Sequence, residues 1–133
     1  MKIRTFLALE LPKTVRNKLY AHAKLISVRT KQQQIRWLPK GNYHMTLAFL
    51  GNEEYVLINS LQLKLEQNLS YNKAVPFRFS EITPFPFSGT QKIAAAMLEH
   101  SDELMQLQHN TAKCVRAFGM SLEHRRFTPH LTL

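Results

Sequence analysis

The chain carries the same short motif twice, a histidine and a threonine two positions apart with leucine next. "GNYHMTLAFLG" holds His44 and Thr46, and "TPHLTL" holds His130 and Thr132, 86 positions further along. Both motifs sit in apolar runs, which predicts two largely buried strands. A buried strand that still carries two polar side chains on one face needs a reason for them. These two pairs therefore constrain both the fold and the function.

The segments around the two motifs follow one order, which indicates a duplicated unit. The predicted elements are a strand at 2–12, a helix with an apolar stripe over 15–26, a short strand at 35–39, the strand of the first motif, a helix begun by 52–54, a strand at 75–82, a loop at 83–91, a strand at 92–99, a helix from Ser101 to Gly119, and the strand of the second motif. We interpret residues up to about 83 as the first copy and those from about 92 as the second. No helix follows the second motif, so we expect residues 1–133 to form a single two-lobed domain truncated at its C-terminus.

Composition narrows the class of protein. Eighteen Lys and Arg against nine Asp and Glu give a net charge of +9, which favours a nucleic acid or phosphorylated ligand but also suits a merely soluble surface. Cys114 is the only cysteine, so an internal disulfide and a multi-cysteine metal site are excluded. No apolar run approaches the roughly 20 residues that a membrane span needs. We expect a cytoplasmic, soluble monomer with no membrane partner.

The two motifs suit acid–base chemistry at phosphorus. Side chains at i and i+2 of a strand share a face, so each histidine lies beside its threonine, and we expect both pairs to meet in a cleft across a pseudo-twofold axis. An ordinary imidazole pKa of about 6.5 allows one ring to accept a proton while the other donates one. Threonine hydroxyls can hold the phosphate oxygens. The sequence predicts no metal and no cofactor, since it lacks carboxylate clusters. One such motif alone is more often structural; two in equivalent places favour function.

These residues resemble the two-histidine phosphoesterase superfamily, most closely its bacterial and archaeal 2′-5′ RNA ligase-like branch, the RNA 2′,3′-cyclic phosphodiesterases. The similarity lies in "FLALELP", "YHMTLAFLG", "PFP" and "RRFTPHLTL". It implies an α+β fold, bilobal and duplicated, with two antiparallel sheets around a central cleft and helices packed outside. It also implies hydrolysis of an RNA or oligonucleotide 2′,3′-cyclic phosphate end to a 2′-phosphate, with reversible 2′-5′ ligation in some members.

The resemblance also implies roles for individual residues. His44 would be the general acid at the leaving 3′-oxygen, His130 the general base for water, and Thr46 and Thr132 the phosphate-binding residues. A near-symmetric site could equally run with the two histidines exchanged. Family members continue beyond the second motif, typically with a basic residue that helps to hold phosphate, and this sequence lacks that residue.

Four further residues are candidates for binding substrate. Arg125 and Arg126 could contact RNA phosphates or lie in a solvated turn. Phe85 and Phe87 could stack on a base or pack over the edge of the cleft. Two other functions remain open at this point: a nucleotide- or RNA-binding module with the same cleft and little turnover, and a ligase that joins 2′,3′-cyclic phosphate and 5′-hydroxyl ends.

Overall fold

The computed structural model describes residues 1–122 and 126–133 and divides them into two compact units. Unit 1 comprises Met1–Ala8, Thr46–Phe77 and His100–Thr128, and unit 2 comprises Leu9–Met45, Arg78–Glu99 and Pro129–Leu133. Each unit draws on both predicted copies, so the units do not coincide with the copies. The duplication stays a prediction.

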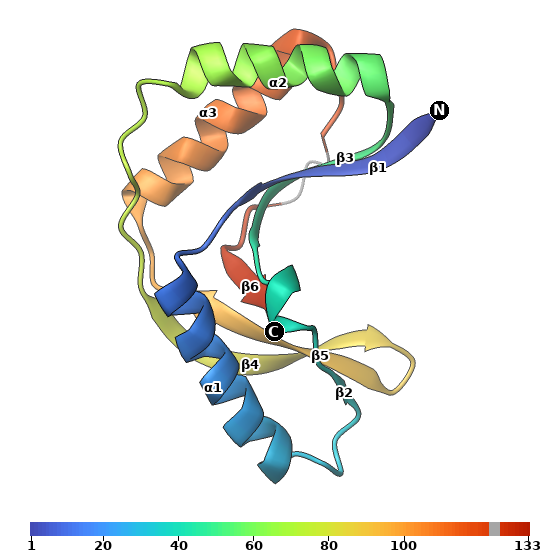
Figure 1. The fold of residues 1–133 in the computed structure, drawn as a ribbon, viewed down its shortest axis with the longest axis vertical. Helices are drawn as coiled ribbons and strands as arrows, with labels where there is room; N and C mark the ends of the chain where they lie inside the picture. The colour runs from blue at the N-terminus through green and yellow to red at the C-terminus, as the bar shows by residue number, and fades with distance from the viewer. Residues whose placement is uncertain (123–125) are drawn as a thin grey trace. The chain divides into compact units, whose positions relative to one another are not determined.

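The predicted order of helices and strands is confirmed along the chain (Figure 1). The elements are β1 (Lys2–Leu9), α1 (Lys13–Arg29), β2 (Ile35–Arg36), η1 (Lys40–Asn42), β3 (Met45–Glu54), α2 (Tyr55–Leu69), β4 (Phe79–Ser88), β5 (Gln91–Leu98), α3 (Asp102–Phe118) and β6 (His130–Thr132). The helices and two sheets make a mixed α+β fold, as the family resemblance implied. Within the described residues, no helix combines the length and the apolar character that crossing a membrane requires.

Unit 1 is built around one apolar cluster beside the two-stranded sheet of β1 and β3. Leu50 from β3, Leu61 from α2 and Val115 from α3 form the cluster together with Met120. The apolar stripes of α2 and α3 supply these contacts, because residues three or four apart share one helix face. Leu61 of α2 and Val115 of α3 therefore face the core.

Both ends of α3 follow local rules. The Ser101 hydroxyl accepts a hydrogen bond from the Leu104 backbone N–H at 3.2 Å, which is the capping role predicted for it. The helix ends at Gly119, whose φ of +102° lies in the left-handed region. The backbone N–H of the next residue, Met120, donates a hydrogen bond to the Val115 carbonyl oxygen at 3.2 Å. The Met120 side chain belongs to the apolar cluster of unit 1.

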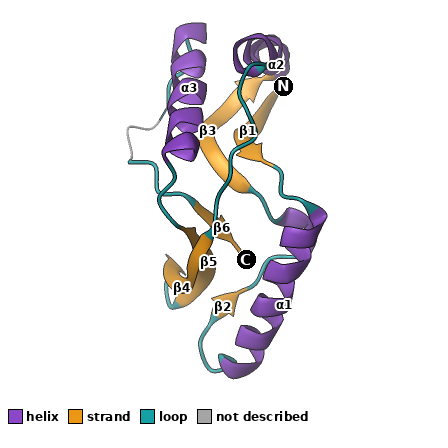
Figure 2. Ribbon diagram, turned by 90° about the vertical axis from the view of Figure 1, so that its left-hand side faces the viewer, coloured by secondary structure: helices purple, strands orange, loops and turns teal. Residues whose placement is uncertain are grey.

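Unit 2 contains a four-stranded sheet with β5 at its centre (Figure 2). Strand β5 pairs antiparallel with β4 along one edge. Along the other edge it pairs in parallel with β2 and antiparallel with β6. The three consecutive alanines Ala94, Ala95 and Ala96 are 0–2% exposed, which confirms the expected burial of this strand on both faces.

Two details of this sheet correct the expectations. The segment 83–91 is not a loop, because β4 runs through Pro84 and Pro86 and stays paired with β5. Proline is compatible with an edge strand, and β4 lies at the edge of this sheet. The sheet is also not wholly antiparallel, since β2 runs parallel to β5.

Phe49 is the exposed member of the apolar residues that alternate along β3. Met45 and Leu47 are buried, but Phe49 is 55% exposed. The core of unit 1 takes the neighbouring Leu50, which leaves Phe49 on the opposite face of the strand. There its ring lies 6.2 Å from that of Phe6 in β1.

The left-handed end of α3 predicts a difference between two Gly-to-Ala substitutions. A Cβ would have open space at both Gly119 and Gly41, but only Gly119 has a positive φ. We expect Gly119→Ala to lower the free energy of unfolding by about 1 kcal/mol, and the melting temperature by roughly 4 °C, because alanine is strained at that φ. Gly41→Ala should leave stability unchanged or slightly raised. Chemical denaturation of both variants checks this, and equal effects would contradict it.

Candidate active site

His130 and Thr132 share one face of the unit 2 sheet. Strand β6 pairs with β5 so that His130 lies opposite Met97 and Thr132 opposite Ala95. His130 is exposed and Thr132 half-buried, whereas the alternate residues Leu131 and Leu133 are fully buried. The alternation predicted for the second motif is therefore confirmed: the polar pair faces away from the leucines.

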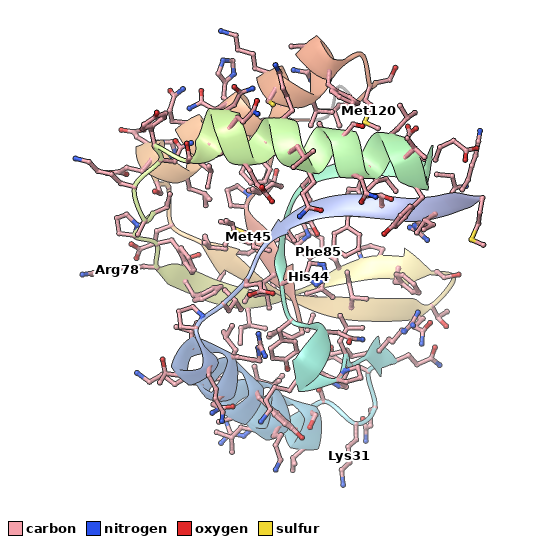
Figure 3. All side chains as sticks on the ribbon, turned by 45° about the horizontal axis from the view of Figure 1, so that its top comes forward. Lys31, His44, Met45, Arg78, Phe85 and Met120 are labelled. Carbon is pink, nitrogen blue, oxygen red and sulfur yellow. The ribbon has the colours of Figure 1, made fainter. Side chains whose placement is uncertain are left out.

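His44 belongs to the same compact unit as His130, although 86 positions separate them in the chain. It lies between η1 and β3 and is half-buried (Figure 3). Its Nδ1 lies 2.7 Å from the backbone carbonyl oxygen of Asn42. A carbonyl oxygen can only accept a hydrogen bond, so Nδ1 carries a proton and its N–H donates a hydrogen bond to the Asn42 carbonyl. Nε2 is then the nitrogen at which this ring can exchange a proton with a substrate.

The remaining predicted residues fall in different places. Thr46 is half-buried at the start of β3, two residues after His44, and belongs to unit 1. Arg126 is exposed in unit 1. Arg125 lies outside the described residues. The roles of these three residues stay predictions.

Phe85 lies on the face of the sheet that carries the second motif. Phe85 lies opposite Ile93 of β5, and Thr132 lies opposite Ala95 of the same strand. Because Ile93 and Ala95 are two residues apart, their side chains share a face, and so do those of Phe85 and Thr132. Phe85 is 39% exposed and Phe87, further along β4, is 50% exposed. Figure 3 labels Phe85 on this strand. Both phenylalanines therefore offer ring surface to solvent, whereas Leu131 and Leu133 are buried.

The sequence interpretation missed Arg36. This residue of β2 lies opposite Ile93 and so on the same face as Phe85 and Thr132. Its guanidinium carbon lies 5.3 Å from the centre of the Phe87 ring, in a cation–π contact. The only sequence signal was the short strand "IRWLP", and its partner strand is more than 50 residues away in the chain. The placement of Arg36 follows from that pairing.

Unit 2 also holds most of the positive charge of the chain. Leu9–Met45 contains eight Lys or Arg and a single Glu. The ammonium groups of Lys24 in α1 and Lys40 in η1 each lie 5.3 Å from the centre of the Tyr20 ring. Burial, and to a smaller extent the nearby Tyr20, raise the pKa of Tyr43, so this phenol beside His44 stays neutral. The segment that leads to His44 is therefore strongly cationic.

The donor set does not resemble a metal site. Among residues 1–122 and 126–133, no three His, Cys, Asp or Glu side chains are grouped closely enough to hold a metal ion. The chemistry that these residues offer is instead that of two imidazoles, hydroxyl groups and a cationic surface.

Comparison with known proteins assigns the family. The model of the 2′-5′ RNA ligase superfamily matches residues 18–133. The RNA 2′,3′-cyclic phosphodiesterase of Bacillus subtilis (strain 168) is 27% identical over 96% of this chain and 68% of its own length.

Solved structures agree on the fold. Crystalline E. coli LigT in complex with 3′-AMP superposes with a TM-score of 0.72 at 22% identity, covering the whole of this chain and 72% of LigT. TT0787 of Thermus thermophilus gives a TM-score of 0.70 at 21% identity, covering 98% of this chain and 73% of TT0787. With the family match extending through both His-x-Thr motifs, the chain belongs to the 2′-5′ RNA ligase superfamily of two-histidine phosphoesterases.

Proposed function

We propose that this chain is an RNA 2′,3′-cyclic phosphodiesterase that uses no metal and forms a 2′-phosphate. The observation that carries the proposal is that His44 and His130 fold into one compact unit, each as the first residue of the same motif. The family match and the activity named for the Bacillus subtilis relative support it. The cationic segment before His44 supports a polyanionic substrate.

In the proposed reaction, water attacks the phosphorus of the cyclic ester while one imidazole accepts its proton. The bond between phosphorus and the 3′-oxygen breaks, and the other imidazole donates a proton to that oxygen. The product is a 2′-phosphate with a free 3′-hydroxyl, and exchange with solvent restores both rings. We assign the acid to His44 and the base to His130. Thr132, and Thr46 on the strand after His44, would donate hydrogen bonds to the phosphate oxygens as charge develops on them.

The Asn42 carbonyl gives His44 a fixed orientation for this task. Nδ1–H donates to that carbonyl in both the neutral and the protonated ring, so the hydrogen bond persists through the catalytic cycle. Only Nε2 changes protonation. A ring held in one orientation loses less freedom when the substrate binds, which favours proton transfer along a single path.

Removing either imidazole should abolish most of the activity. We expect His44→Ala and His130→Ala each to lower kcat/KM on a 2′,3′-cyclic nucleotide by at least about 100-fold, the usual contribution of a general acid or base. His109→Ala is the matched control, since His109 is exposed on α3 in unit 1. Near-normal rates in both site variants would refute the proposal. Salt-dependent RNA binding without hydrolysis by the unaltered protein would instead identify a binding module.

Turnover should not require a divalent cation. The proposed steps use only side chains, so we expect the rate in excess EDTA to stay within about 2-fold of the untreated rate, because no metal-bound water is needed. Steady-state assays with EDTA, and after adding back Mg²⁺ or Mn²⁺, measure this. A loss restored by metal would contradict the mechanism.

The product should be a single regioisomer. Because the acid is placed at one of the two ester oxygens, we expect only the nucleoside 2′-phosphate. Chromatography against authentic 2′- and 3′-nucleotides identifies it. A mixture, or the 3′-phosphate, would show that the assigned leaving oxygen is wrong.

A further inference from the structure

The sheet face that carries His130 and Thr132 continues beyond them along β5. Strand β5 presents Met97, Ala95 and Ile93 to this face in turn, since side chains alternate along a strand. Residues opposite one another in paired strands project to the same side. His130 and Thr132 therefore lie at the first two of these positions and Arg36 at the third, all from strands on the same edge of β5.

Aromatic side chains meet this row from the other edge of β5. Phe85 lies opposite Ile93, at the level of Arg36. Phe87 follows where the register of β4 shifts, between Pro86 and Ser88, and its ring is covered on one side by the Arg36 guanidinium. Both rings remain 39–50% exposed. Phe6 and Phe49 in unit 1 are exposed to a similar degree, so what distinguishes Phe85 and Phe87 is their position beside the row of His130, Thr132 and Arg36.

We propose that Arg36, Phe85 and Phe87 form a subsite for the nucleotide on the 5′ side of the cyclic phosphate, so that the preferred substrate is an oligonucleotide end. The assignment rests on the proposed function and names the part of the RNA that this face binds. An exposed guanidinium plane and aromatic rings are the usual stacking partners of unpaired bases.

The spacing along β5 favours the neighbouring nucleotide over the terminal one. Arg36 lies one two-residue step from Thr132, about 6.6 Å along the strand. Phe87 lies at the level of Lys92 and Gln91, three to four residues from the level of Thr132, or roughly 10–13 Å. The base of the terminal nucleotide is joined to the reacting phosphate through its own ribose alone, so it stays near His130 and Thr132. The base of the preceding nucleotide of the RNA can reach Arg36 and Phe87.

The charge on Arg36 fits the same assignment. Among the described residues no carboxylate pairs with its guanidinium, which lies against the face of Phe87 instead. A guanidinium in a cation–π contact still has N–H groups that can donate hydrogen bonds to a phosphate. The phosphodiester that links the terminal nucleotide to its neighbour is the group that these N–H groups can bind.

The test compares a 2′,3′-cyclic mononucleotide with a dinucleotide that ends in the same cyclic nucleotide, using the full chain. We expect Arg36→Gln and Phe87→Leu each to raise KM for the dinucleotide about 10-fold, within the range measured when one stacking partner is lost. The mononucleotide KM and both kcat values should change less than about 2-fold, since the subsite does not touch the reacting atoms. Arg116→Gln, which removes an exposed charge from α3 in unit 1, outside the cationic segment and the subsite, is the matched control.

The outcomes separate this proposal from the proposed function. Equal changes for both substrates, or no change for either, would overturn the subsite while hydrolysis continued. If the unaltered protein hydrolyses neither substrate, dissociation constants replace KM, measured with a 2′-phosphorylated mononucleotide and a 2′-phosphorylated dinucleotide. Arg36→Gln and Phe87→Leu should then weaken binding of the dinucleotide but not of the mononucleotide. Circular dichroism checks that each variant is folded, and Phe85→Leu replaces Phe87→Leu if the latter unfolds.

Discussion

Strand β5 is the element on which the candidate site depends. Its hydrogen bonds to β4, β2 and β6 determine which side chains of three separate chain segments face the same way. A shift of one residue in any of these pairings would move every side chain of that strand to the opposite face. The alanines Ala94, Ala95 and Ala96 are buried, and a shift of register would place different side chains against them, so their packing opposes such a shift. The register of a strand without catalytic side chains therefore positions His130 and Thr132 together with the proposed subsite residues Arg36 and Phe85.

The route of the chain explains why both histidines depend on the same folding event. Unit 2 takes His44 from its first segment and His130 from its last. The chain between them passes through unit 1, returns to unit 2 for Arg78–Glu99 and passes through unit 1 again. Contacts between residues so far apart in sequence form only after a large loss of chain entropy. A substitution that weakens the sheet should thus affect both ends of the proposed acid–base pair together, even if it is remote from either ring.

Local patterns were enough to predict most of the secondary structure and the central residues. Ser101 and Gly119 mark the ends of α3 through their own chemistry, and the alternation around His130 needs only its immediate neighbours. Pairing is non-local, and there the sequence interpretation failed. The parallel β2 strand and the role of Arg36 depend on a partner in β5 that no short pattern identifies. Pro84 and Pro86 were misread because proline excludes central strands but not edges. The family resemblance supplied the roles that geometry alone does not determine.

The edge strand β4 carries exposed aromatic rings, and its prolines limit pairing of its outer edge with a strand of another molecule. An open edge beside apolar side chains is a template for association with another strand. Pro84 and Pro86 lie two residues apart and so present the same backbone edge, and neither has an N–H to donate. The pairing of β4 with β5 continues through both prolines. Edge strands tolerate proline where the missing N–H faces outward, and such an outer edge is a poor partner for a further strand. The prolines thus oppose aggregation at the place where Phe85 and Phe87 are exposed. Burying these rings would have been the simpler solution for stability alone, so their exposure on the face of His130 and Thr132 favours a role in binding.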